Sequence, residues 1–133
     1  MTDGTCDTYY RYGSYGGYSK LDQLIAVERK YGSMTTYRSA SYQYDPNYNR
    51  TRLRDGEGGV TQYQYDADNR LTLVGYPVFP GGYATEFQYE EVGNRATMTE
   101  ANGDVASYVY DNVYRLVSEE KRDSGQNLLY IEV

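Results

Sequence analysis

Aromatic and polar residues alternate along short stretches of this chain. Tyr42 and Tyr44 flank Gln43, and the same spacing of two residues recurs at Tyr63 and Tyr65. Because side chains at i and i+2 project from one face of a strand, both rings of a pair share a face and the glutamine points the other way. Tyrosine, threonine and valine, which are common around these pairs, favour a pleated strand. The alternation therefore predicts β-strands.

A four-residue phrase of ring, any residue, ring and acid occurs four times, and an arginine follows the second ring after five or six residues. The second rings are 21, 24 and 21 residues apart. A period of about 20–50 residues indicates an array in which each unit buries its face against its neighbours. The motif consists of Tyr42, Tyr44, Asp45 and Arg50, then Tyr63, Tyr65, Asp66 and Arg70, then Phe87, Tyr89, Glu90 and Arg95, and finally Tyr108, Tyr110, Asp111 and Arg115.

Turn-forming sequences separate the predicted strands. The acid that ends each phrase can accept a backbone hydrogen bond two residues further on and so start a bend. The arginine then opens a second strand, which ends at a segment rich in Gly, Asn or Asp. Two turns in each unit predict an all-β fold, an antiparallel meander of repeated hairpins that forms a curled sheet. The segments that end the second strands are residues 55–59, 81–82, 102–103 and 123–125.

A fainter copy of the pattern lies near the N-terminus. Displaced by fifty residues, Tyr15 and Lys20 align with Tyr65 and Arg70, although a glycine follows Tyr15 where the acid is expected. Residues 21–27 alone are also compatible with a short helix, but the alignment favours a strand. We therefore expect one structural unit, an excerpt of a longer protein, with a degenerate repeat over 1–36 and the repeat array over 37–133.

Composition narrows the possible functions. The chain has 19 Tyr and only 2 Phe, so we expect an interior of rings whose hydroxyls are hydrogen-bonded. A net charge of −6 disfavours nucleic acid or an anionic membrane surface as a partner. No apolar run reaches the length of a membrane span, and the first residues do not resemble a signal peptide.

The sequence offers no convergent catalytic, cofactor or metal site. Histidine is absent, which removes the usual general base and a common metal ligand. Cys6 is the only cysteine and no neighbouring base activates it. Residues 55–59 could offer oxygen ligands to calcium, but their spacing fits neither an EF-hand nor a nonapeptide repeat, so a hairpin turn is the preferred interpretation. We therefore predict no enzyme activity, no cofactor and no metal.

The phrase Tyr-x-Tyr-Asp, followed by Gly-Asn-Arg or Gly-Arg-Leu, resembles the YD-repeat or RHS-repeat family. Residues 89–95 resemble the first form and residues 65–71 the second. The resemblance implies hairpins that spiral into a hollow shell, as in bacterial polymorphic toxins, insecticidal toxin complexes and teneurins. Such shells enclose a toxin or act as scaffolds at cell surfaces. Nothing after Arg115 matches the segment that cleaves off the cargo in toxin members.

The chain departs from the family pattern in its turns. The family glycine is kept at Gly93, and Asn69 is a tolerable substitute. Tyr48 and Tyr114 stand at the equivalent positions, where a positive φ would be costly for tyrosine. Either these two turns adopt another geometry or their units are weakened.

Two functional hypotheses follow. In the first, the rings stack between strands, each arginine binds a carboxylate, a carbonyl or a Tyr hydroxyl, and the chain is a structural segment of a secreted or cell-surface bacterial shell. Its partners are then neighbouring repeats, an enclosed toxin cargo, and other copies that pair with its exposed sheet edges. In the second, an exposed strip of tyrosines binds a glycan or a protein, as in an adhesin.

Overall fold

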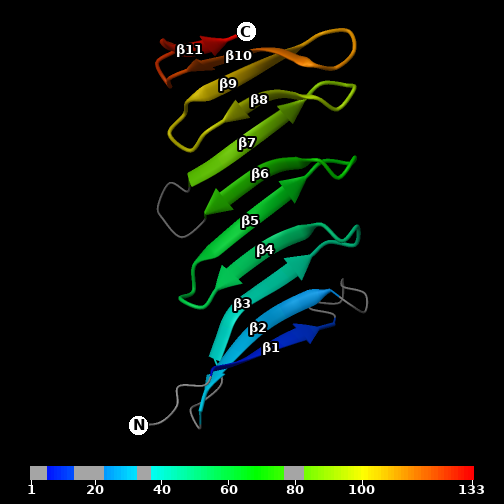
Figure 1. The fold of residues 1–133 in the computed structure, drawn as a ribbon, viewed down its shortest axis with the longest axis vertical. Helices are drawn as coiled ribbons and strands as arrows, with labels where there is room; N and C mark the ends of the chain where they lie inside the picture. The colour runs from blue at the N-terminus through cyan, green and yellow to red at the C-terminus, as the bar shows by residue number, and fades with distance from the viewer. Residues whose placement is uncertain (1–5, 14–22, 33–36, 77–82) are drawn as a thin grey trace. The chain divides into compact units, whose positions relative to one another are not determined.

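The computed structural model describes residues 6–13, 23–32, 37–76 and 83–133. Within them, eleven strands and no helix are found, and each strand lies next to its neighbour in sequence (Figure 1). Every pairing described is antiparallel, so the all-β meander predicted from the alternation is confirmed. The strands are β1 (Cys6–Tyr12), β2 (Leu24–Tyr31), β3 (Tyr37–Tyr44), β4 (Arg50–Asp55), β5 (Val60–Tyr65), β6 (Leu71–Tyr76), β7 (Tyr83–Tyr89), β8 (Arg95–Thr99), β9 (Val105–Tyr110), β10 (Leu116–Arg122) and β11 (Leu128–Glu132).

The chain divides into two compact units. The first comprises Met1–Tyr63 with Tyr76–Val78, and the second comprises Gln64–Gly75 with Phe79–Val133. In the first unit β1 to β5 pair in succession, and in the second β7 to β11 do so. The predicted organisation into residues 1–36 and 37–133 stays a prediction.

One five-residue turn recurs between the strands. At Asp66, the backbone N–H donates to the carbonyl of Arg70 at 3.0 Å, and the N–H of Asn69 donates back to the carbonyl of Asp66 at 3.1 Å. This is the hairpin connection in which a type I turn is followed by one left-handed residue. The same two bonds close the turns that begin at Asp45, Asp55, Asp66, Glu90, Glu100, Asp111 and Asp123.

The fourth residue of each turn has a positive φ. Gly93 adopts it at 96°, and Asn69 at 62°. Tyr48 and Tyr114 also adopt it, at 70° and 64°, so the other turn geometry that the sequence left open does not occur at these two sites. Both tyrosines therefore occupy a conformation that disfavours side chains with a Cβ.

The N-terminal elements are strands. The helix considered for residues 21–27 is wrong for its described part, because β2 begins at Leu24 and pairs with β1 and β3. The alignment of Tyr15 and Lys20 with the repeat, and the turn expected at 81–82, lie outside the described residues.

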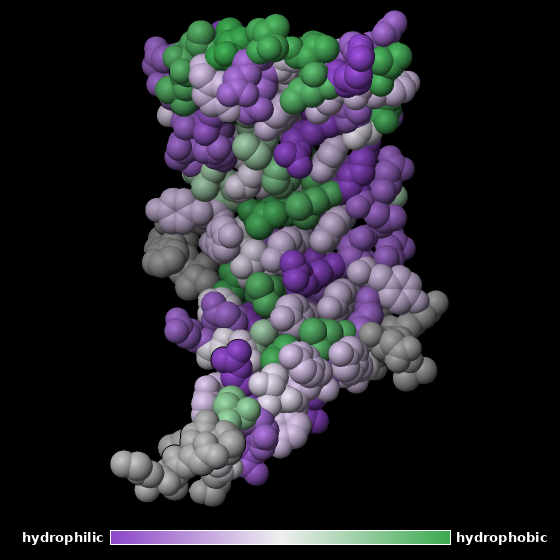
Figure 2. Space-filling model, in the orientation of Figure 1, coloured by the Kyte–Doolittle hydropathy of each residue, from purple (hydrophilic) through white to green (hydrophobic). Residues whose placement is uncertain are grey.

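Few apolar side chains are fully covered. Among the described residues, Ala26 in the first unit and Ala106 in the second are buried, at 2% and 1% exposure. Half-buried rings fill more of the sheet, and the hydroxyls of Tyr44 and Tyr89 donate to the carbonyls of Leu24 and Leu71, each at 2.8 Å. Figure 2 shows hydrophobic side chains over the C-terminal strands, where Leu129 of β11 is 52% exposed. The described residues contain no helix of the length and hydrophobicity that a membrane crossing requires.

Candidate functional site

The acids of the motif hold the turns that follow them. Asp66 accepts hydrogen bonds at Oδ1 from the backbone N–H of Asp68 and of Arg70, both at 2.9 Å. Asp111 does the same with Val113 at 2.9 Å and Arg115 at 3.0 Å. The bond from the Arg70 backbone is the main cause that lowers the pKa of Asp66, and that from the Arg115 backbone lowers the pKa of Asp111.

The residue four positions after the acid contacts its second oxygen. Arg70 reaches Asp66 Oδ2 through Nε at 2.7 Å, and Arg115 reaches Asp111 Oδ2 at 2.8 Å. Where the arginine comes one residue later, an asparagine takes this place, as in the bond from Asn49 Nδ2 to Asp45 Oδ2 at 3.0 Å. In the third copy Asn94 Nδ2 donates to Glu90 Oε2 at 3.2 Å.

The motif arginines therefore fall into two classes. Arg70 and Arg115 belong to their own turns, whereas Arg50 and Arg95 follow the turn and begin a strand. The repeat pattern predicts that the four are equivalent. The signal that separates them is the spacing from the acid, which is four residues in the first class and five in the second.

In the first unit, Arg50 lies between two rings of the motif. Its guanidinium carbon is 4.7 Å from the ring centroid of Tyr63 and 5.9 Å from that of Tyr42. Its Nη2 also donates to the Tyr63 hydroxyl at 3.3 Å. Tyr42 is on β3 and Tyr63 on β5, so this arginine joins strands on both sides of β4.

In the second unit, Arg70 and Arg95 lie over rings. The guanidinium of Arg70 is 4.9 Å from the centroid of Tyr89, and that of Arg95 is 4.8 Å from Phe87. Arg70 also donates from Nη1 to the carbonyl of Glu90 at 3.3 Å, and the Tyr89 hydroxyl donates to the carbonyl of Leu71 at 2.8 Å. The turn at Arg70 is thereby tied to the turn at Glu90, twenty residues later.

The remaining motif rings keep the predicted alternation. Tyr108 and Tyr110 lie half-buried on β9, while Val109 between them is 55% exposed. Tyr65 is half-buried at the end of β5. Ring-on-ring stacking is seen outside the motif, between Tyr31 and Tyr37, whose centroids are 5.8 Å apart.

The contacts of the motif residues tie strands and turns to one another. Within the described ranges no group of three or more His, Cys, Asp or Glu side chains could hold a metal ion. Asp55, considered above for calcium, uses Oδ1 to accept from the N–H of Glu57 at 3.0 Å and of Gly59 at 2.7 Å. It therefore holds a turn as the motif acids do.

Solved structures share this fold. The crystal structures of TcdB2-TccC3-Cdc42 and of TcdB2-TccC3 each align with a TM-score of 0.69 at 18% identity, over 86% of this chain and 6% of that chain. A Photorhabdus luminescens Tc holotoxin pore aligns with a TM-score of 0.52 at 10% identity, over 95% of this chain and 10% of that chain. No protein-family model and no curated protein matches. The chain thus corresponds in fold to a small part of much longer toxin components.

Proposed function

We propose that this chain is a non-enzymatic segment of a YD-repeat shell, which encloses a toxin or scaffolds a surface assembly. The observation that carries the proposal is the repetition of one turn, closed by the same two backbone bonds, along a meander whose fold aligns with TcdB2-TccC3 over 86% of the chain. Equivalent hairpins that contact only their neighbours are suited to extended walls and poorly suited to a buried active site.

The chemistry of the motif supports a structural role. Asp66 and Asp111 use their oxygens to hold turns, and Arg50, Arg70 and Arg95 lie over rings. An active site needs a nucleophile, a base and a stabilising group directed at one point. These side chains are instead engaged with their own turns and neighbouring strands.

We infer the localisation and the partner of the shell from the same similarity in fold. The components that align include a Tc holotoxin pore of a bacterium, so we expect a secreted or surface-bound bacterial assembly with an enclosed polypeptide as its partner. The chain would be one part of a longer array.

The second candidate is a binding module that contacts a glycan or a protein through tyrosines. The observation in its favour is β1, on which Tyr9, Tyr10 and Tyr12 are 46%, 60% and 61% exposed. A glycan array probed with the chain discriminates between the two. A structural shell segment is expected to bind no glycan on the array. Reproducible binding that disappears when these tyrosines are changed to alanine would favour the binding module.

Protease protection tests enclosure. The reading frame that contains this chain would be expressed whole and digested, with the polypeptide encoded beyond the repeats followed by mass spectrometry. We expect that polypeptide to resist digestion, and to become sensitive in an Asp66→Ala, Asp111→Ala variant that loses two turns. Asp68→Ala, an exposed change in one of the same turns, is the matched control. If the polypeptide were cleaved in the unmodified protein as readily as in the Asp66→Ala, Asp111→Ala variant, the proposal would be overturned.

A further inference from the structure

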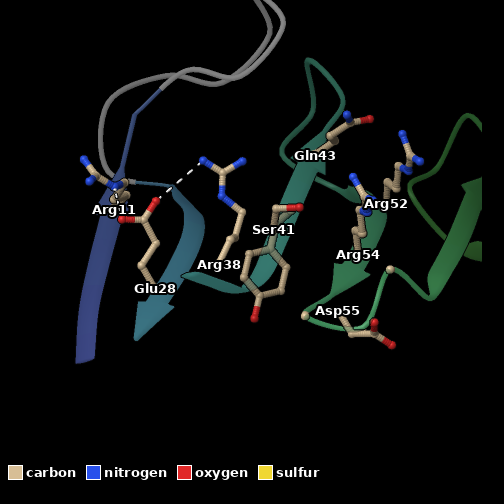
Figure 3. Close-up of a pocket in the computed structure, with 11 residues that line it drawn as sticks. Arg11, Glu28, Arg38, Ser41, Gln43, Arg52, Arg54 and Asp55 are labelled. Carbon is tan, nitrogen blue, oxygen red and sulfur yellow. Dashed lines mark hydrogen bonds and ion pairs between the residues drawn. The ribbon is translucent and has the colours of Figure 1, made fainter. Parts of the chain in front are cut away.

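A hollow of about 580 Å³ on the first unit gathers arginines from three strands. Arg11 comes from β1, Arg38 from β3, and Arg52 and Arg54 from β4 (Figure 3). Ser41 of β3 is directly opposite Arg54 in the strand register. The remaining lining residues are Glu28, Tyr42, Gln43, Asp55, Gly56 and Gly58.

Two of these arginines already have an acidic partner. Glu28 is 8% exposed, and its carboxylate lies 2.7 Å from Arg11 Nε and 3.6 Å from Arg38 Nη2. The dashed lines in Figure 3 mark both contacts. The hydrogen bond from Arg11 is the main cause that lowers the pKa of Glu28, so this carboxylate is ionised and pairs with both guanidinium groups.

Arg52 and Arg54 have no carboxylate within ion-pair distance among the described residues. The nearby acid, Asp55, directs Oδ1 to the backbone of its own turn. In addition, Nε of Arg52 is buried without a hydrogen-bond acceptor. A buried N–H without a partner is costly and calls for an explanation such as a bound group.

The strand geometry defines what could occupy this place. Because Arg52 and Arg54 are two residues apart on β4, they project from one face with their Cα atoms about 7 Å apart. Side chains at alternate positions of an extended peptide have the same spacing. Each planar guanidinium can bind a carboxylate through two parallel bonds.

We propose that this hollow binds an extended acidic peptide segment, with carboxylates at alternate positions that pair with Arg52 and Arg54. The hollow carries four arginines against two acids, in a chain of net charge −6, so it would attract an anion that the rest of the chain repels. Gln43 is opposite Arg52 in the register, so its side-chain amide offers a neutral donor and acceptor beside the peptide carboxylate that pairs with Arg52. The inference does not depend on the proposed shell function.

Binding of synthetic peptides to the whole chain tests the proposal. The probe is a labelled peptide with glutamate at alternating positions, and its counterpart carries glutamine at the same places. We expect the glutamate peptide to bind, the glutamine peptide not to bind, and equimolar inorganic phosphate not to displace the bound peptide. In nuclear magnetic resonance spectra the Nε–H signal of Arg52 should shift when the glutamate peptide is added, because its buried N–H gains an acceptor.

Two variants separate the site from general charge. Arg54→Gln changes an exposed side chain and should weaken binding about tenfold, because a charge-assisted pair is lost. Arg29→Gln removes an equal charge from β2, next to Glu28 and therefore on the opposite face, and should change binding by less than about twofold. Equal binding of both peptides, displacement by equimolar phosphate, no binding at all, or equal loss in both variants would each overturn the proposal.

Discussion

At the scale of single residues, tyrosines stand where the turn requires a positive φ. Tyr114 adopts 64° in a turn whose bonds are otherwise the same as those of the glycine-containing turn at Gly93. Its side chain is 62% exposed, so little packing offsets the unfavourable backbone. The hydrogen bonds that Asp111 accepts from the backbone hold this turn, although Tyr114 and not glycine occupies its left-handed position.

Replacing Tyr114 by glycine should therefore stabilise the protein. Relief of the left-handed backbone is worth about 1–2 kcal/mol and the added freedom of the unfolded chain costs about 0.4–1, so we expect a gain of about 0.5–1 kcal/mol in the free energy of unfolding. Urea denaturation measures it. Val113→Gly, in the same turn but at a negative φ, is the control and should destabilise. A loss of stability in Tyr114→Gly would show that the backbone there is not under strain.

The turn acids also predict how stability depends on pH. The pKa values of Asp66, Asp111 and Asp123 are lowered from the usual value of an aspartate, chiefly by hydrogen bonds from backbone N–H groups in the first two and from the Asn127 side chain in the third. A carboxyl group whose pKa is lower in the folded than in the unfolded protein stabilises the fold at any pH above its unfolded-state pKa. This stabilisation is lost as the pH falls through its folded-state pKa. We expect a melting temperature that is nearly constant between about pH 7 and 5 and falls below about pH 4.

Substitution at one turn tests the origin of this acid sensitivity. Asp66→Asn keeps an oxygen for the backbone N–H groups but cannot ionise. Its melting temperature should be lower at neutral pH, and the difference from the unmodified protein should shrink as the pH falls below about 4. A difference that persists unchanged in acid would mean that the charge of Asp66 is unimportant.

At the scale of the hairpin, Arg70 links consecutive elements. It contacts the carboxylate of its own turn, the ring of Tyr89 and the carbonyl of Glu90. The equivalent Arg115 contacts Asp111, and its side chain is 78% exposed. The same motif position therefore makes more contacts at Arg70 than at Arg115.

Arg70→Gln should accordingly destabilise the second unit. Loss of the ring and carbonyl contacts is worth about 1 kcal/mol. Arg115→Gln removes the same charge from an exposed pair and should change stability little. Thermal unfolding of both variants provides the comparison. An equal effect at the two positions would contradict a linking role for Arg70.

Much of this hairpin architecture could be predicted from the sequence. Aromatic rings at alternate positions predicted the strands, and the acid after each second ring predicted the turns. The φ of Tyr48 and Tyr114 could not be predicted, because local preference opposes it and the bonds that Asp45 and Asp111 accept in these turns are not visible in the local preference of tyrosine. The arginine-lined hollow was also missed, since Arg11 comes from β1, which lies outside the repeat that contains β3 and β4.

At the scale of the whole molecule, β11 is the last strand in the order of the described sheet. All five residues of β11 are exposed, and Leu128, Leu129 and Ile131 are 50%, 52% and 49% exposed. Among the described strands β11 pairs only with β10. Exposed apolar edges promote pairing with other chains.

We therefore expect the chain to self-associate as its concentration rises, which sedimentation velocity measures. Ile131→Lys should shift the chain toward monomer, because a charged edge opposes pairing, and the new lysine would face Glu120 in the register. Val92→Lys introduces the same change in a turn where the valine is 60% exposed, and should leave association unchanged. A monomer at all concentrations would exclude edge pairing.

The recurring turn has a consequence for how such proteins can change length. Strands that begin and end in the same five-residue turn are interchangeable, so recombination of the gene at two matching turns would add or delete two hairpins, four strands in about 45 residues, without changing the face from which each side chain projects. Tyr44 and Tyr89 mark two such points. A fold of this kind can grow by duplication in steps, with every intermediate length still able to fold.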